Sequence, residues 1–128
     1  MIYVITHKEF DDKSFCKEGY QVLHVGTNTN MKPYYLRDDV LENIAEKNSH
    51  FCELTGMYWI WKNGKENADE IVGLVHYRRG FTSKKENLVY SMGGEVPSNI
   101  NFKEAKEILK NFDMIVPIPE KGFKTVYQ

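Results

Sequence analysis

An apolar run, Ile71–Val75, leads directly into the segment His76-Tyr77-Arg78-Arg79. An arginine side chain stays charged and offers a planar fork of N–H donors, which fits the oxygens of a phosphate group. The segment is therefore a candidate site for a diphosphate or a sugar phosphate. The alternative is a strand end whose arginines pair with nearby acids, and these residues alone favour neither interpretation. If the segment is extended, alternation groups His76 with Arg78 and separates both from Arg79.

Three further groups of polar residues have both a functional and an ordinary interpretation. Thr6-His7-Lys8 follows a predicted strand and can contact a nucleotide, although a lone histidine is weak evidence. Asn43, Lys47 and Asn48 carry donors suited to ribose or phosphate, yet such residues also cap helices and face solvent. Glu53 lies near the start of a predicted helix, where it either complements the helix dipole or acts as a catalytic base.

The hydrophobic pattern predicts a series of short strands and helices that would position these residues. The predicted strands are Ile2–Ile5, Gln21–Val25, Ile71–Val75, Leu88–Tyr90 and Asp113–Pro117, and the predicted helices cover 38–47, 49–62 and 102–111. The run Ile71–Val75 is continuously apolar, which predicts a strand buried on both faces of a parallel sheet. The order of these elements predicts an α/β layer architecture. In such open sheets, ligands bind beyond the carboxyl ends of the strands.

The predicted helix at 49–62 carries a periodic apolar stripe, formed by Phe51, Leu54, Tyr58 and Trp61. This spacing favours a surface that faces the core, and we expect Phe51 and Trp61 to be core residues. Tyr58 and Trp59 are either core residues too or a platform for a base or a sugar ring. The helix at 102–111 is expected to begin with a capping box at Asn101.

The bulk composition is that of one globular domain spanning residues 1–128. The formal net charge is −1, so composition gives no indication of a nucleic-acid or membrane partner. The two cysteines, Cys16 and Cys52, are far apart and are expected to be buried thiols in a reducing compartment. No signal peptide or membrane-spanning segment is recognised, which favours a cytoplasmic location.

The sequence identifies no certain cofactor. It lacks the glycine-rich nucleotide motifs and also the Asp-x-Asp motif that would hold a divalent metal on a diphosphate. The adjacent pairs Asp11-Asp12 and Asp38-Asp39 have diverging side chains and form no clear ligand set. Manganese or magnesium is left open as a cofactor of the chemistry.

Several blocks of the chain occur in a recognisable order. They are Thr6-His7-Lys8, Glu42-Asn43-Ile44 through Lys47-Asn48, Phe51-Cys52-Glu53-Leu54-Thr55, Tyr58-Trp59 with Trp61-Lys62-Asn63, and Val72-Gly73-Leu74 with His76-Tyr77-Arg78-Arg79. Together they resemble the DUF4422 family of glycosyltransferases of capsular and exopolysaccharide synthesis, over almost the whole chain. The resemblance implies a Rossmann-like fold of the GT-A type, with a mainly parallel sheet flanked by helices. It also implies transfer of a sugar, such as galactose or galactofuranose, from a UDP-sugar donor to a lipid-linked glycan.

The resemblance also implies roles for the candidate residues. The donor-binding set would place Thr6, His7 and Lys8 near the nucleotide, Asn43, Lys47 and Asn48 near the ribose or donor sugar, and Arg78 and Arg79 on the diphosphate. The two arginines would offset the charge of the leaving diphosphate in place of a metal. Either Glu53 or His76 would be the base that deprotonates the acceptor hydroxyl.

Members of the family are usually longer than this chain, which resembles their N-terminal part. The first hypothesis is therefore an enzyme fragment that binds a nucleotide-sugar, with a cytoplasmic location that includes the inner face of the membrane. The second is a non-catalytic binding or assembly module, which would expose the apolar surface that its missing half covers and would self-associate or bind a partner through it. The third is a nucleotidyltransferase, which is disfavoured because that chemistry needs metal-binding carboxylates.

Overall fold

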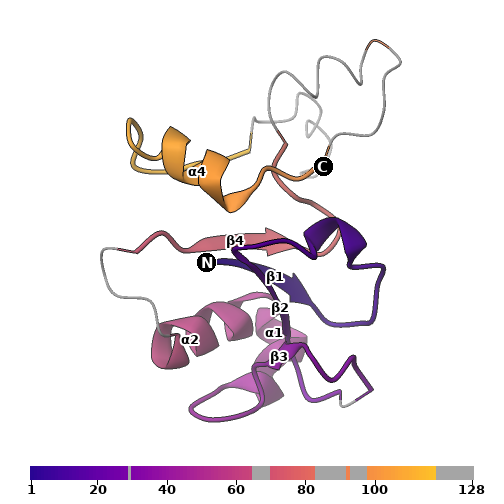
Figure 1. Cartoon of the computed structure of the whole chain (residues 1–128). Helices are drawn as coiled ribbons and strands as arrows, with labels where there is room; N and C mark the ends of the chain where they lie inside the picture. Colours follow the sequence, from indigo (N-terminus) through magenta and orange to yellow (C-terminus); the bar gives the residue numbers. More distant parts are fainter. Residues whose placement is uncertain (29, 65–69, 83–91, 93–97, 118–128) are drawn as a thin grey trace, which may run out of the picture.

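The computed structural model describes residues 1–28, 30–64, 70–82, 92 and 98–117. Its centre is a four-stranded parallel sheet with the strand order β3-β2-β1-β4 (Figure 1). The strands are β1 (Ile2–Thr6), β2 (Tyr20–His24), β3 (Leu36–Arg37) and β4 (Gly73–His76). The predicted α/β architecture and parallel sheet are confirmed.

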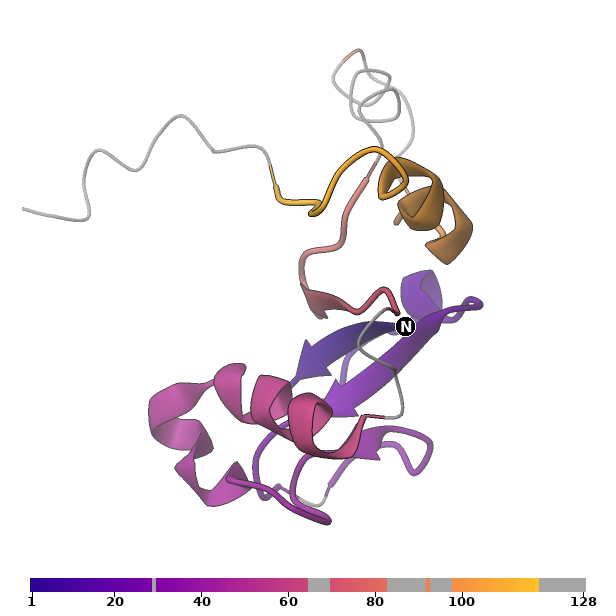
Figure 2. The same cartoon turned by 90° about the vertical axis from the view of Figure 1, so that its left-hand side faces the viewer.

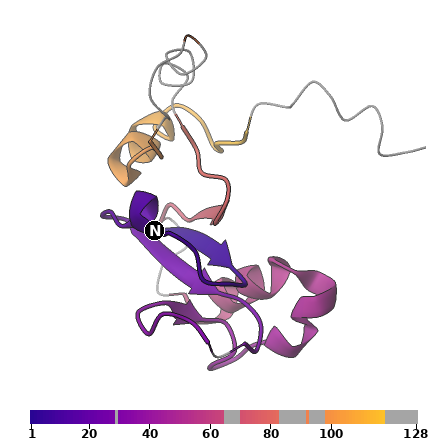
Figure 3. The same ribbon diagram turned by 90° about the vertical axis from the view of Figure 1, so that its right-hand side faces the viewer.

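Helical segments lie on both faces of this sheet (Figures 2 and 3). On one face, α1 (Asn48–Phe51) leads into α2 (Leu54–Asn63), and a 3-10 turn, η2 (Ala45–Lys47), precedes α1. On the other face lie the 3-10 turn η1 (Lys13–Phe15) and α4 (Phe102–Ile108). The two faces therefore have separate cores.

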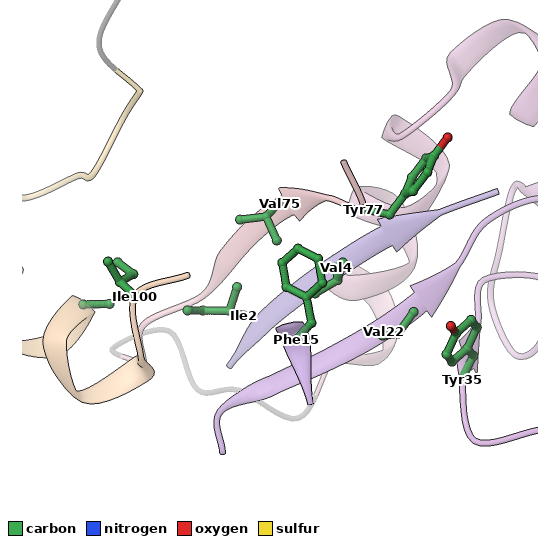
Figure 4. Close-up of a cluster of buried hydrophobic side chains, with 9 residues drawn as sticks. Ile2, Val4, Phe15, Val22, Tyr35, Val75, Tyr77 and Ile100 are labelled. Atoms are coloured by element: carbon green, nitrogen blue, oxygen red, sulfur yellow. The ribbon is translucent and has the colours of Figure 1, made fainter. Parts of the chain in front are cut away.

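The first core forms because the strand register aligns alternate side chains. Val4 of β1 pairs with Val22 of β2 on one side and with Val75 of β4 on the other. Phe15 and Ile100 pack on the same cluster (Figure 4). The second core lies on the opposite face and contains Tyr3, Ile5, Leu23, Val25 and Trp59.

The most deeply buried strand is β1, and β4 is less buried than its apolar sequence predicts. All five residues of β1 are buried, because β1 has a paired strand on each side. β4 instead lies at the edge of the described sheet, where only Val75 is buried and Val72 is 48% exposed. The prediction of a strand buried on both faces is met only in part: Val75 packs in the first core, and Leu74 packs against the second but is only partly buried.

The predicted helix at 49–62 is two helices, and its predicted core stripe faces outward. Cys52 separates α1 from α2 with a φ of 48°, a conformation that a non-glycine residue rarely adopts. The buried residues of α2 are Thr55, Gly56 and Trp59. The core assignments of Phe51 and Trp61 are therefore wrong, since these side chains are 47% and 72% exposed. Of the two residues with alternative interpretations, Trp59 is a core residue and Tyr58 is partly buried.

Gly56 explains why this face of α2 approaches the sheet. A Cβ atom at Gly56 would lie 2.8 Å from Val25 Cγ1 and 3.0 Å from Ile5 Cδ1. A helix can therefore press its backbone against the strands here, which a row of large side chains would prevent.

We expect Gly56→Ala to destabilise the protein although alanine is the better helix former. Crowding a packed core costs about 1–3 kcal/mol, and the gain in helix propensity offsets about 1 kcal/mol of this. Urea unfolding should therefore show a lower midpoint with an unchanged slope. Met57→Ala, at an exposed position of the same helix, is the control and should be nearly neutral. A Gly56→Ala variant more stable than the parent would contradict this packing argument.

Among the remaining predicted elements, the capping box of α4 is confirmed, and the helix at 38–47 and the strand at 113–117 are not. The helix expected at 38–47 is wrong: β3 precedes it, Leu41 has a φ of 58°, and only the short η2 forms. The cysteines are exposed, not buried. Asp113–Pro117 forms no strand, and Leu88–Tyr90 lies outside the described residues. The capping box at α4 is confirmed, because the Glu104 carboxylate accepts the Asn101 N–H at 2.7 Å and the Asn101 side chain accepts the Glu104 N–H at 2.8 Å.

A buried carboxylate joins two connections on one side of the sheet. Asp12, which is 4% exposed, accepts hydrogen bonds from Lys32 at 2.9 Å, Tyr34 at 2.8 Å and Tyr35 at 2.9 Å. Burial by itself would raise the pKa of Asp12, but these bonds outweigh it and the pKa lies below its ordinary value of 3.8. Lys32 also donates to the carbonyl of Phe10 at 3.2 Å. The β1–β2 and β2–β3 connections are thereby tied together.

Candidate functional site

The strand order creates a crevice at the carboxyl ends of β1 and β4. After β1 the chain builds β2 and β3 on one side, and it then crosses to place β4 on the other side of β1. Ligands of open α/β sheets bind at such a reversal of strand order. Thr6 and His7 lie at the end of β1, and His76 lies at the end of β4.

A pocket of about 340 Å³ opens at this crevice. Its lining comprises Ile5, Thr6, His7, Val25, Asn48, Ser49, Cys52, Glu53, His76 and Arg78. An adjacent pocket of about 300 Å³ shares Glu53, His76 and Arg78 with it and adds Arg79. Seven of the ten candidate residues named from the sequence therefore meet around two neighbouring pockets: Thr6, His7, Asn48, Glu53, His76, Arg78 and Arg79.

The remaining three candidates do not line either pocket. Asn43 uses its side chain within its own loop, accepting from the Ala45 N–H at 3.1 Å and donating to the Leu41 carbonyl at 2.8 Å. Lys47 is exposed at the start of α1. Lys8 lies nearer, with its Nζ 5.6 Å from the centre of the Tyr77 ring.

His76 and Glu53 face each other across the pocket. The Nε2 atom of His76 lies 3.6 Å from Oε1 of Glu53, and its Nδ1 atom accepts the backbone N–H of Arg78 at 3.3 Å. Burial lowers the pKa of His76, and Arg78 lowers it further, while Glu53 raises it. Because Nδ1 acts as an acceptor, Nε2 is the nitrogen left to carry the proton, and it lies 3.6 Å from the Glu53 carboxylate, which is longer than a hydrogen bond.

The two arginines are open to the pockets. Both side chains are exposed, and among the residues that the structure describes neither forms an ion pair with a carboxylate. The chain turns after β4, where the Arg79 N–H donates to the His76 carbonyl at 2.8 Å. This turn overrides the simple alternation, so Arg79 lies on the same side as His76 and Arg78. Among the described residues, Arg78 and Arg79 are therefore not paired with acids, which disfavours the alternative interpretation of this strand end.

Tyr77 is a residue whose importance the sequence did not reveal. Its ring is buried, and four ionisable side chains surround it. The His76 ring lies at 4.4 Å from its centre, the His7 ring at 5.6 Å, Lys8 Nζ at 5.6 Å and Arg78 Cζ at 5.3 Å. A side chain that alternates away from the pocket thus supports the residues that face it. Thr6 contributes too, because its hydroxyl accepts the Lys8 N–H at 3.2 Å and fixes the turn that carries His7.

Asn48 has a supporting contact that differs from its expected role. Its Nδ2 atom donates to the Cys52 carbonyl at 2.8 Å and to the Thr55 hydroxyl at 2.9 Å. These bonds hold the corner between α1 and α2, where Glu53 is placed. Asp38 fixes the neighbouring strand end, because its Oδ1 accepts the Gly26 N–H at 2.8 Å. No short motif marks Asp38, because its partner Gly26 lies twelve residues earlier in the chain. Cys52 and Thr55 fall within one of the blocks of the family resemblance, but the sequence does not show that both bind the Asn48 side chain.

In the described part of the chain, no group of three or more His, Cys, Asp or Glu side chains is arranged to hold a metal ion. The described helices include none that is both long and apolar enough to span a membrane.

Comparison with known proteins connects the chain to a family. The family model described as a domain of unknown function, DUF4422, matches residues 1–128. Among solved structures, the chain is similar to the apo structure of WbbM, a bifunctional glycosyltransferase, with 40% sequence identity and a TM-score of 0.53. The match covers 66% of this chain and 15% of that chain. No curated protein matches the chain.

These similarities agree with the observed fold. The parallel sheet flanked by helices, together with the likeness to WbbM, identifies a Rossmann-like fold of the GT-A type. The chain is glycosyltransferase-like in both sequence and structure. It belongs to the DUF4422 family.

Proposed function

We propose that the pockets at the ends of β1 and β4 bind the diphosphate of a UDP-sugar, and that the chain is the donor-binding part of a glycosyltransferase of capsular or exopolysaccharide synthesis. The observation that carries this proposal is the pair Arg78 and Arg79, which face the pockets without a carboxylate partner among the described residues. Two guanidinium groups at a strand-order reversal suit a ligand with several phosphate oxygens.

The remaining side chains have roles that follow from their positions. Thr6 and His7 lie at the end of β1, beside the volume that the nucleotide would fill. Glu53 is the better candidate for the base, because its carboxylate lines both pockets, whereas Nδ1 of His76 is already occupied by the Arg78 N–H. His76 lies beside this carboxylate, with Nε2 at 3.6 Å from Oε1.

The reaction that this arrangement supports is a single group transfer. The Glu53 carboxylate takes the proton of an acceptor hydroxyl, and the oxygen attacks the anomeric carbon of the donor sugar. The bond from that carbon to the diphosphate oxygen breaks, and UDP leaves with the electron pair. Arg78 and Arg79 stabilise the negative charge that develops on the diphosphate.

The two exposed cysteines allow a direct test of donor binding. Cys52 lines the pocket and Cys16 does not. UDP is expected to slow the alkylation of Cys52, by about tenfold at ten times its Kd, because only the free fraction of the protein reacts. Mass spectrometry of the labelled peptides, with and without manganese, gives both rates in one sample.

Cys16 is the internal control and should react at the same rate throughout. Uridine, which lacks the diphosphate, should protect Cys52 much less than UDP. If the folded protein shows equal Cys52 alkylation at every UDP concentration, with and without manganese, the pocket does not bind the donor.

A binding or assembly module is the alternative, and one observation favours it. Phe112, Met114 and Val116 are between 63% and 72% exposed. Exposed apolar groups of this size suit association with another protein surface. Light scattering over a range of concentrations tests this alternative: a monomer at every concentration that also binds UDP would contradict it.

A further inference from the structure

The outer side of α2 carries large apolar side chains that the core does not use. Leu54, Met57 and Trp61 are 54%, 49% and 72% exposed, and Phe51 of α1 is 47% exposed. We call Leu54, Met57 and Trp61 the α2 row. Neighbouring exposed apolar groups of this kind on a small protein mark a site of interaction.

The α2 row starts at the proposed base. Glu53, Met57 and Trp61 are spaced by four residues, so on a helix they follow one another along the same side. Glu53 lines both pockets. With a rise of 1.5 Å per residue, Trp61 lies about 12 Å along the helix from Glu53. The row therefore leads away from the reaction centre over the length of a short oligosaccharide.

The Trp61 end of the row is held in place by polar contacts. The rings of Tyr58 and Trp61 meet edge to face, with centroids 5.7 Å apart, and Lys62 Nζ lies 4.2 Å from the centre of the Trp61 ring. Glu42 accepts the Tyr58 hydroxyl at 3.0 Å and pairs with Lys62 at 3.0 Å. The Lys62 ammonium thus lies over one face of an indole that remains 72% exposed, and Glu42 holds the two neighbours of that indole.

We infer that the α2 row binds the acceptor glycan, with a sugar ring stacked on Trp61. This inference rests on the proposed function, because it assigns the second substrate of the same reaction. A pyranose ring has an apolar C–H face and a hydroxyl-bearing edge, which match an indole face with a polar border. An acceptor bound there reaches the Glu53 carboxylate with its terminal hydroxyl.

The charges around the row favour a glycan over a lipid surface. Glu42, Glu46 and Glu53 accompany Lys47 and Lys62, so no excess of positive charge is available for an anionic membrane.

The two tryptophans make the inference testable by fluorescence. Trp59 is 6% exposed and Trp61 is 72% exposed, so iodide quenching reports mainly on Trp61. Tri- and tetrasaccharides of galactose and of glucose are the probes, with the free monosaccharides for comparison. At least one oligosaccharide is expected to reduce the quenching, and Trp61→Ala should weaken its binding, measured by calorimetry, about tenfold.

Two variants separate stacking from a general effect on the fold. Trp61→Phe keeps an aromatic face and should retain most of the affinity for the oligosaccharide. Phe112→Ala removes a similarly exposed aromatic group that follows α4, on the other side of the sheet, and should bind like the parent. Protection of Cys52 by UDP should persist in all three variants, because Trp61 and Phe112 do not line that pocket.

The outcomes distinguish this inference from the proposed function. If UDP protects Cys52 but no oligosaccharide reduces quenching, the inference is wrong and the donor site stands. If oligosaccharides protect Trp61 but UDP has no effect on Cys52, the row binds glycans and the proposed donor site is wrong. If iodide quenching of Trp61 increases when the protein is diluted, the row binds a second copy of the chain. If the Trp61 emission shifts to the blue on neutral phosphatidylcholine vesicles and no oligosaccharide binds, the row binds lipid. Either result would overturn the inference.

Discussion

An Arg78→Ala, Arg79→Ala double variant is expected to bind UDP about a hundredfold more weakly than the parent. Each guanidinium would donate charge-assisted hydrogen bonds to the diphosphate, and such bonds contribute about 1.5–3 kcal/mol each. Because both arginines are exposed, solvent screening reduces this contribution, and we expect the loss of binding free energy to lie near the lower end of the range for two such bonds. Calorimetric titration with UDP at moderate ionic strength gives the affinities directly.

Matched variants make this result specific to the arginine pair. Lys47→Ala removes a basic residue that lies outside both pockets and should change the affinity less than twofold, within the range of about 0.4 kcal/mol. An Arg78→Lys, Arg79→Lys variant keeps the charge but loses the planar fork, and should fall between the two. If the double alanine variant binds UDP as tightly as the parent, the arginine pair does not bind the diphosphate.

Replacing the buried carboxylate of Asp12 should produce the largest loss of stability. Asp12→Ala leaves Lys32, Tyr34 and Tyr35 without their shared acceptor and separates the two connections that Asp12 joins. We expect a loss of about 2–4 kcal/mol in the free energy of unfolding, because bonds to a buried charge are among the strongest in proteins. Chemical denaturation measures this loss. Asp11→Ala, at the exposed neighbouring position, should stay within about 0.5 kcal/mol of the parent.

The same carboxylate also predicts how stability depends on pH. The pKa of Asp12 is lower in the folded protein than its ordinary value of 3.8, so the folded state binds a proton less readily than the unfolded chain. The contribution of Asp12 is complete well above pH 3.8 and declines as the pH falls through that value toward the folded pKa. The parent should lose stability in acid more steeply than Asp12→Ala. Parallel pH curves for both proteins would show that the carboxylate is not stabilised by its partners.

The strands and the main candidate residues could be predicted from the sequence because their signals are local. Ile2–Ile5 and Gln21–Val25 match β1 and β2 to within one residue at either end. The capping box at Asn101 needs only residues three apart, and it forms as predicted. Parallel strands then bring Thr6, His7 and His76 to one edge, because their carboxyl ends must lie together.

The helix at 49–62 shows where local signals end. Periodicity predicts an apolar face, but it does not say whether that face meets the sheet. Here the strands accept the side with Gly56 and Trp59, because a glycine lets the backbone approach Val25 and Ile5 closely. The larger side chains of the other face, Trp61 included, remain outside.

The sequence by itself determined the strands, the α/β class and the segments that carry the candidate chemistry, because each depends on neighbours along the chain. Only the tertiary structure decided which side of α2 is buried, which polar residues reach the pockets and which do not. Asn48, Glu53 and Arg79 reach the crevice because a strained residue at Cys52 and a turn after His76 redirect the chain. The hydrogen bonds at these changes of direction join residues only three or four apart, from Asn48 to Cys52 and from Arg79 to His76, but the hydrophobic pattern of the chain does not record them.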